Sequence, residues 1–148
     1  MKKIFFLVVI LTLSLLCRAQ ERKYSTFYYQ RATLFEELPV TSSDIIFLGN
    51  SITNGAEWAE LFKNKHVKNR GISGDTSDRL LERLECNALN INPKNLVILF
   101  GTNDIGIGVP TEYTLKNIKE ILQRTQKLCP NTNIVLQAIY PVNSHLSI

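Results

Sequence analysis

Four short segments with the character of strands alternate with segments of helical periodicity along this chain, and this alternation constrains the fold more than any other feature. The strand segments are residues 44–49, 66–70, 96–100 and 133–140. Segments 44–49 and 96–100 are almost entirely apolar, which is typical of strands buried on both faces of a parallel sheet. Strands that alternate with helices form such sheets. The sequence therefore predicts an α/β fold with a parallel sheet of four strands covered by helices.

The helices between these strands are predicted from apolar residues that recur at three- and four-residue spacing. They are expected at residues 25–38, 55–65, 76–91 and 111–129. Leu115 belongs to the apolar stripe predicted for the last helix, and Asp75 or Thr76 is expected to cap the start of the third. Because segment 66–70 is more polar than the other strands, we expect it near an edge of the sheet.

Residues 1–19 have the layout of a secretory signal peptide. Two lysines precede an apolar run that is too short for a membrane span, and Ala19 supplies the small residue at the exit. We expect cleavage after Ala19 and an exported, periplasmic or secreted protein, with residues 20–148 forming one domain. A lipoprotein modified at Cys17 is the alternative, which Leu16 disfavours because a small residue usually precedes such a cysteine.

The charge of the chain gives no indication of an anionic partner. The sequence holds 17 Lys and Arg against 13 Asp and Glu, but Lys2, Lys3 and Arg18 lie in the predicted signal peptide. The remaining domain has 14 basic and 13 acidic residues and is close to neutral. No cluster of Lys and Arg with interleaved aromatic residues occurs, which argues against nucleic-acid binding.

The cysteines and histidines do not form a metal-binding pattern. Cys86 and Cys129 remain after removal of the signal peptide, and the sequence leaves open whether they pair or stay separate thiols. His66 and His145 stand far apart without nearby ligand partners.

Three polar turns that contain glycine follow three of the predicted strands. They are residues 49–53, 71–76 and 101–104. Reactive groups in parallel sheets gather beyond the carboxyl ends of the strands, so we expect the three turns on one rim. Ser51 in the first turn would be an exposed nucleophile, and Gly74 in the second lets its N–H approach the same point without a side chain. With the side-chain amide of Asn103, these groups could bind the oxyanion of an acyl-transfer reaction.

The same turns carry a resemblance to a known family. Gly-Asn-Ser-Ile-Thr at residues 49–53 resembles the first block of the GDSL, or SGNH, hydrolases, Asn-Arg-Gly-Ile-Ser-Gly-Asp-Thr-Ser at residues 69–77 resembles the second, and Gly-Thr-Asn-Asp at residues 101–104 resembles the third. Within this superfamily the chain is similar to the small acetylhydrolases of the platelet-activating-factor acetylhydrolase type and to sialate or carbohydrate O-acetylesterases. The blocks occur in the order and spacing of the family.

The resemblance implies a fold, an activity and site residues. The fold would be a three-layer α/β/α sandwich, flavodoxin-like, with a five-stranded parallel sheet and no cofactor. Ser51 would be the nucleophile, and the backbone N–H groups of Ser51 and Gly74 with the Asn103 side chain would bind the oxyanion. The substrate would be a small-molecule carboxylic ester, with an acetyl or other small acyl group on a carbohydrate or lipid.

Two departures from the family pattern limit this expectation. Asn50 stands where the family usually has aspartate, and the Asp-x-x-His block that follows the fifth strand and supplies the base does not occur. We therefore expect a chain that is incomplete at its C-terminus, with four strands and little activity. His145 follows the fourth strand on the correct rim, but Val142 stands where the acid would be, and His66 should lie at the opposite end of the sheet.

Two alternatives to an esterase remain open from the sequence. One is a non-catalytic carbohydrate- or lipid-binding module on the same fold. The other is a chain completed by a partner that supplies the last strand and the histidine. The oligomeric state is not determined by the sequence.

Overall fold

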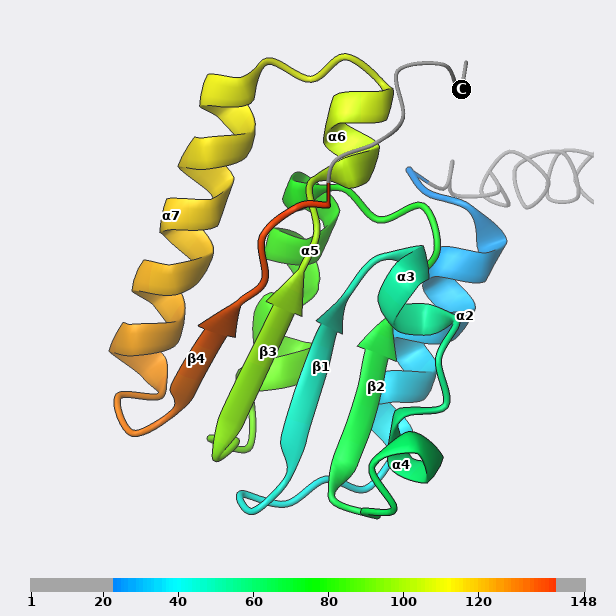
Figure 1. Ribbon diagram of the computed structural model, residues 1–148, viewed down its shortest axis with the longest axis vertical. Coiled ribbons are helices and arrows are strands. Elements are labelled where there is room, and N and C mark those ends of the chain that lie inside the picture. The colour runs from blue at the N-terminus through cyan, green and yellow to red at the C-terminus, as the bar shows by residue number, and fades with distance from the viewer. Residues whose placement is uncertain (1–22, 141–148) are drawn as a thin grey trace, which may run out of the picture.

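The computed structural model describes residues 23–140 and contains a parallel sheet of four strands in the order β2-β1-β3-β4 (Figure 1). The strands are β1 (Ile45–Gly49), β2 (Val67–Gly71), β3 (Asn95–Leu99) and β4 (Asn133–Leu136). All three pairings are parallel, and β2 lies at an edge as its polar sequence predicted. The predicted α/β fold is confirmed.

In the described residues, three longer helices cover one face of the sheet. These are α2 (Thr26–Glu37), α5 (Ser77–Leu84), which continues as a π-helical segment η1 (Glu85–Leu89), and α7 (Thr111–Leu128). In Figure 1, α2 and α5 lie behind the strands and α7 stands beside β4. Strand side chains alternate between the two faces of a sheet, and the helix side receives the most apolar ones. The main core cluster joins Ile46 and Leu48 of β1 to Leu80 of α5 and Ile121 of α7, all at most 1% exposed.

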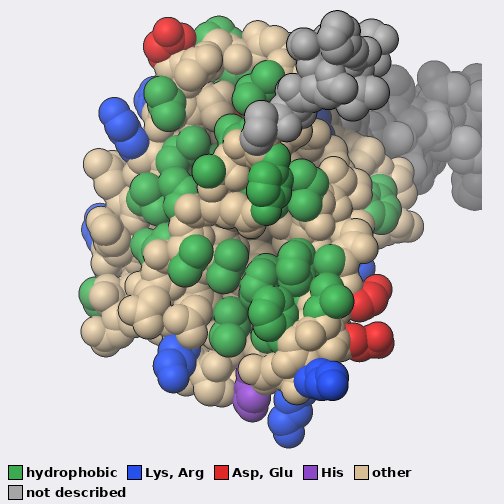
Figure 2. Space-filling model, in the orientation of Figure 1, with side chains coloured by type: hydrophobic (Ala, Val, Ile, Leu, Met, Phe, Trp, Pro, Cys, Tyr) green, Lys and Arg blue, Asp and Glu red, His purple; other side chains and the backbone are tan. Residues whose placement is uncertain are grey.

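Among residues 23–140, the helices on the opposite face are short. These are α3 (Ser51–Asn54) and α4 (Trp58–Leu61), which pack against β1 and β2. Phe47 of β1 stacks on Trp58 with ring centroids 4.6 Å apart, and the Trp58 Nε1–H donates to the Thr53 carbonyl at 2.8 Å. Figure 2 shows the resulting apolar patch on this face, in the region of β1, β2 and α4. Trp58 therefore belongs to a packing cluster on the sheet.

The helix predicted at residues 55–65 is wrong in length, since only Trp58–Leu61 is α-helical. Gly55 ends α3, and Lys63 has a φ of +48°, which interrupts a right-handed helix. Phe62, which follows α4, is 58% exposed.

Two other boundaries differ from the sequence prediction. Strand β4 ends at Leu136, and Gln137 makes the last sheet bond, from its N–H to the Ile98 carbonyl at 2.9 Å. Because β3 itself ends at Leu99, it offers no further backbone hydrogen-bond partners to β4. On α7 the buried stripe runs through Thr114, Asn117, Ile121 and Thr125, and Leu115 is 49% exposed.

The described residues contain no disulfide bond and no membrane-spanning helix. Cys86 is exposed and Cys129 is buried, and both are free thiols. Within residues 23–140, no helix combines the length and apolar character that crossing a membrane requires.

Candidate active site

The three polar turns lie at the carboxyl ends of the strands, at the top in Figure 1. In the parallel register Gly49, the last residue of β1, is level with Gly71 of β2 and with Leu99 of β3. The three strands therefore end together, and the loops that hold Ser51, Gly74 and Asn103 start from the same rim. Their placement follows from strand register, which the sequence could indicate only through the position of each turn.

The loop after β1 is compact because glycine allows close packing. A Cβ atom at Gly49 would lie 2.3 Å from the Leu99 carbonyl oxygen and 2.3 Å from Thr53 Oγ1. The Asn50 side chain is 1% exposed, and its Oδ1 accepts the Ile52 N–H at 3.1 Å, so Asn50 caps α3. Asparagine thus performs the capping that an aspartate would perform, but without its charge. Ser51 is the first residue of α3 and is exposed.

The loop after β2 requires a glycine at position 74. Gly74 has a φ of +80°, which is unfavourable for residues with a Cβ atom, although no heavy atom would lie within 4 Å of one. The Gly74 carbonyl accepts from Arg79 Nη1 at 3.1 Å. Asn54 Nδ2 of the first loop donates to Ser73 Oγ at 3.3 Å, so these two loops contact each other.

The loop after β3 holds the Asn103 side chain against the second loop. Asn103 lies in the short helix α6 (Thr102–Gly106), and its Nδ2 donates to the Asp75 carbonyl at 2.7 Å. An amide NH₂ group has two hydrogens, so this bond orients the group and leaves one hydrogen for another acceptor. Asn103 and the Gly74–Asp75 segment are thereby joined.

Asp104 connects the third loop to two helices. Its carboxylate is 1% exposed and accepts both the Ser77 N–H, at 3.0 and 3.1 Å, and the Ser77 hydroxyl at 2.5 Å. Asn117 of α7 donates to the same hydroxyl at 2.8 Å. Of the two predicted cap residues, Thr76 occupies the N-cap position of α5, but it makes no side-chain cap bond, and Asp104 supplies the acceptor instead.

Arg83 joins the first loop to the second and was not identified from the sequence. Its guanidinium is 2% exposed, donating from Nε to Asp75 Oδ2 at 2.7 Å and from Nη2 to the Gly49 carbonyl at 3.1 Å. Burial raises the pKa of Asp75, while the adjacent Arg83 acts in the opposite direction. The sequence did indicate that Arg83 is buried and paired. Arg83 lies in the apolar stripe of its helix with Leu80 and Leu84, where an unpaired charge would be unfavourable.

Asn69 is another residue to which the sequence analysis assigned no role. Its Nδ2 donates to the carbonyls of Thr53, Ala56 and Asn54 at 2.9, 3.0 and 3.3 Å, and its Oδ1 accepts the Gly71 N–H at 2.8 Å. One side chain on β2 thus fixes the segment that follows Ser51.

The base candidates are separated from this rim or lie outside the described residues. His66 precedes β2 at the amino end of the strands, and its Nδ1 lies 2.8 Å from Asp44 Oδ1. Its position opposite the rim agrees with the sequence-based expectation. His145 lies outside residues 23–140, so its relation to Ser51 stays a prediction.

Asp44 at that opposite end makes a testable contribution to acid stability. Burial alone would raise the pKa of Asp44, but the Thr41 N–H, His66 and Lys68 outweigh burial and lower the pKa. A lowered folded-state pKa stabilises the fold above the unfolded pKa, and this stability is lost as pH falls through the folded value. We expect the free energy of unfolding to fall less in Asp44→Asn than in the wild type between about pH 5 and about pH 2. Urea denaturation at both pH values measures this, and equal falls would contradict it.

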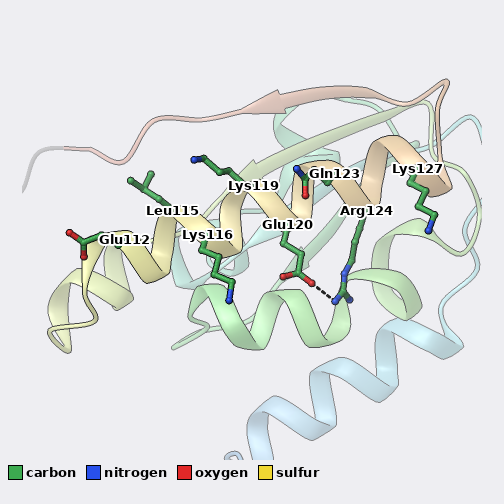
Figure 3. A pocket seen from close by; sticks show the side chains of 8 residues that line it. All are labelled: Glu112, Leu115, Lys116, Lys119, Glu120, Gln123, Arg124 and Lys127. Atoms are coloured by element: carbon green, nitrogen blue, oxygen red, sulfur yellow. Dashed lines mark hydrogen bonds and ion pairs between the residues drawn. The ribbon is translucent and has the colours of Figure 1, made fainter.

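A groove on the surface of α7 lies apart from the three loops. This groove of about 730 Å³ runs along α7 and is lined mainly by charged side chains, as Figure 3 shows. Its lining residues come from α7 alone and none comes from the three loops. Within residues 23–140, no three His, Cys, Asp or Glu side chains come together where they could hold a metal ion.

Comparison with known proteins gives consistent matches. The model of the GDSL-like Lipase/Acylhydrolase family matches residues 47–147. Platelet-activating factor acetylhydrolase IB subunit alpha1 of Rattus norvegicus is 34% identical over 107 residues, which cover 69% of this chain and 45% of that protein. The subunit beta homolog of Drosophila melanogaster is 34% identical over 105 residues, covering 66% and 45%.

Solved structures of other proteins share the fold of this chain. A protein from Streptococcus pneumonia has a TM-score of 0.74 at 30% identity, covering 95% of this chain and 63% of that chain. A GDSL-like lipase from Bacteroides thetaiotaomicron has a TM-score of 0.61 at 29% identity, covering 74% and 56%. The chain spans about half the length of the curated relatives it matches.

Proposed function

Because this chain belongs to the GDSL-like lipase/acylhydrolase family, we propose that its Ser51 hydroxyl attacks carboxylic esters of small acyl groups, such as acetyl on a carbohydrate or lipid. The single observation that carries this proposal is the common rim. Ser51, Gly74 and Asn103 belong to three loops that start from strands ending at the same level. Platelet-activating factor acetylhydrolase subunits among the relatives support an acetyl ester. The predicted signal peptide supports export as part of the same proposal.

The proposed reaction proceeds through a tetrahedral intermediate. The Ser51 oxygen forms a bond to the ester carbon and gives its proton to a base, while the carbonyl π electrons move to the oxygen. The N–H groups of Ser51 and Gly74 and the free hydrogen of the Asn103 amide would stabilise that oxyanion. Collapse of the intermediate breaks the bond to the alkoxide, which takes the proton from the base and leaves as the alcohol. Water then hydrolyses the acyl-serine ester, which releases the carboxylic acid and returns the serine.

The base is the part of this mechanism that the described residues do not supply. His66 is at the opposite end of the strands, and a serine without a base is a weak nucleophile. The 148-residue chain is therefore expected to hydrolyse p-nitrophenyl acetate slowly, and added imidazole should replace the base. The rate with imidazole should rise in the wild type above the rate measured with Ser51→Ala, which controls for hydrolysis by imidazole itself.

Each result of this experiment has a definite meaning. Equal imidazole-dependent rates for the wild type and Ser51→Ala would remove Ser51 from the mechanism. Rapid turnover without imidazole, or rapid labelling of Ser51 by a fluorophosphonate, would show that the chain already provides a base. Saturable glycan binding without ester turnover would favour the non-catalytic alternative.

A further inference from the structure

Three arginines surround one phenylalanine on the helix-covered side of the sheet. The guanidinium carbons of Arg31, Arg70 and Arg83 lie 4.7, 4.9 and 6.0 Å from the centroid of the Phe35 ring. Arg70, Arg83 and Phe35 are each 2% exposed. The face of an aromatic ring attracts cations, which helps to place the guanidinium groups here, but the ring supplies no counter-charge.

The negative charge beside this cluster is not sufficient to balance it. Arg83 is paired with Asp75. Within residues 23–140, Arg31 and Arg70 form no ion pair. Lys68, two residues before Arg70 on the same strand and the same face, differs because its ammonium lies 3.9 Å from Asp44 and donates to the Lys65 carbonyl at 2.8 Å. The missing counter-charge is therefore specific to the arginine cluster.

Several guanidinium nitrogens in the cluster are buried without a hydrogen-bond acceptor in the described part of the chain. Arg70 donates from Nη1 to the Asn69 carbonyl at 3.0 Å, but its Nε and Nη2 have no partner there. The same holds for Arg31 Nε and Arg83 Nη1. A buried charged group that lacks acceptors is strongly unfavourable, so donors in this number call for an acceptor.

Arg70 keeps its charge in spite of this environment. Burial, together with the guanidinium groups of Arg31 and Arg83, lowers the pKa of Arg70 to about 10. The group is therefore cationic at neutral pH, and loss of a proton does not resolve the imbalance.

We infer that the guanidinium groups of Arg31 and Arg70 bind a small inorganic anion beside Phe35. Planar guanidinium groups present parallel N–H donors that suit anions, and oxyanions in particular. One anion would provide acceptors for the unpartnered nitrogens and offset the excess positive charge. This inference does not depend on the ester hydrolase proposal.

The test is the thermal unfolding of the 148-residue chain at neutral pH and constant ionic strength. Sodium chloride or sodium phosphate replaces sodium HEPES, whose bulky sulfonate serves as the reference anion. We expect the Tm of the wild type to rise saturably, by about 5 °C, with at least one of the two probes. Arg70→Met should lose this rise and, in HEPES alone, should be at least as stable as the wild type, because it removes an unpaired buried charge.

The matched control is Lys68→Met, which removes one positive charge from the same strand and face and should keep the wild-type rise. Arg31→Met provides a second variant, expected to weaken the response, if Arg70→Met does not fold. An absence of any specific Tm rise in the wild type with both probes would overturn the inference. An equal rise in the wild type and the arginine variants would also overturn it.

Discussion

Replacing Arg83 by methionine is expected to lower the free energy of unfolding by about 3–5 kcal/mol, which is typical of breaking one side of a buried ion pair. The substitution removes the cation that pairs with Asp75, a residue with 0% exposure, and the donor to the Gly49 carbonyl. The Asp75 carboxylate would then remain buried without a partner. Urea denaturation followed by circular dichroism measures the loss.

A double variant identifies the cause of that loss. Asp75→Asn removes the charge that Arg83→Met leaves unpaired, so the double variant should lose less stability than the sum of the two single variants. Arg124→Met is the matched control, because Arg124 pairs with Glu120 on the surface of α7 and should contribute at most about 1 kcal/mol. Additive losses for Arg83 and Asp75 would contradict the buried-pair explanation.

Replacing Asn103 by alanine is expected to lower the Ser51-dependent rate with imidazole by about a hundredfold or more, as the loss of one oxyanion donor does in other enzymes. The physical reason is that the Asp75 carbonyl already orients the Asn103 amide, so its second hydrogen can meet the developing charge without reorganisation. The rate is the difference between each protein and its counterpart with Ser51→Ala, measured with p-nitrophenyl acetate.

The control for this second prediction is Asn131→Ala, an exposed asparagine before β4 at the other end of the sheet. It should leave the rate unchanged. The unfolding midpoint of Asn103→Ala should also be measured, because the variant loses the bond to Asp75. An unchanged rate in a folded Asn103→Ala protein would exclude Asn103 from the mechanism.

The prediction from sequence was most successful where local periodicity and burial agree. Runs such as residues 96–100 have few alternatives to a buried strand, and the observed β3 (Asn95–Leu99) differs by one residue at each end. It failed at residues 55–65, where apolar spacing suggested a helix but Gly55 and the positive φ of Lys63 limit α4 to one turn. Periodicity records which side chains are apolar and does not record where the backbone must turn.

The sequence by itself determined the class of fold, the order of strands and helices along the chain, and the three turns with Ser51, Gly74 and Asn103. It could do so because each depends on residues that are close together in the chain. Only the tertiary structure decided that Asp104 caps a helix 27 residues before it, that Arg83 joins Gly49 to Asp75, and that Arg70 lies beside Phe35. These contacts join segments that are distant along the chain, and their energies depend on burial, which arises only when the sheet and its helices pack together.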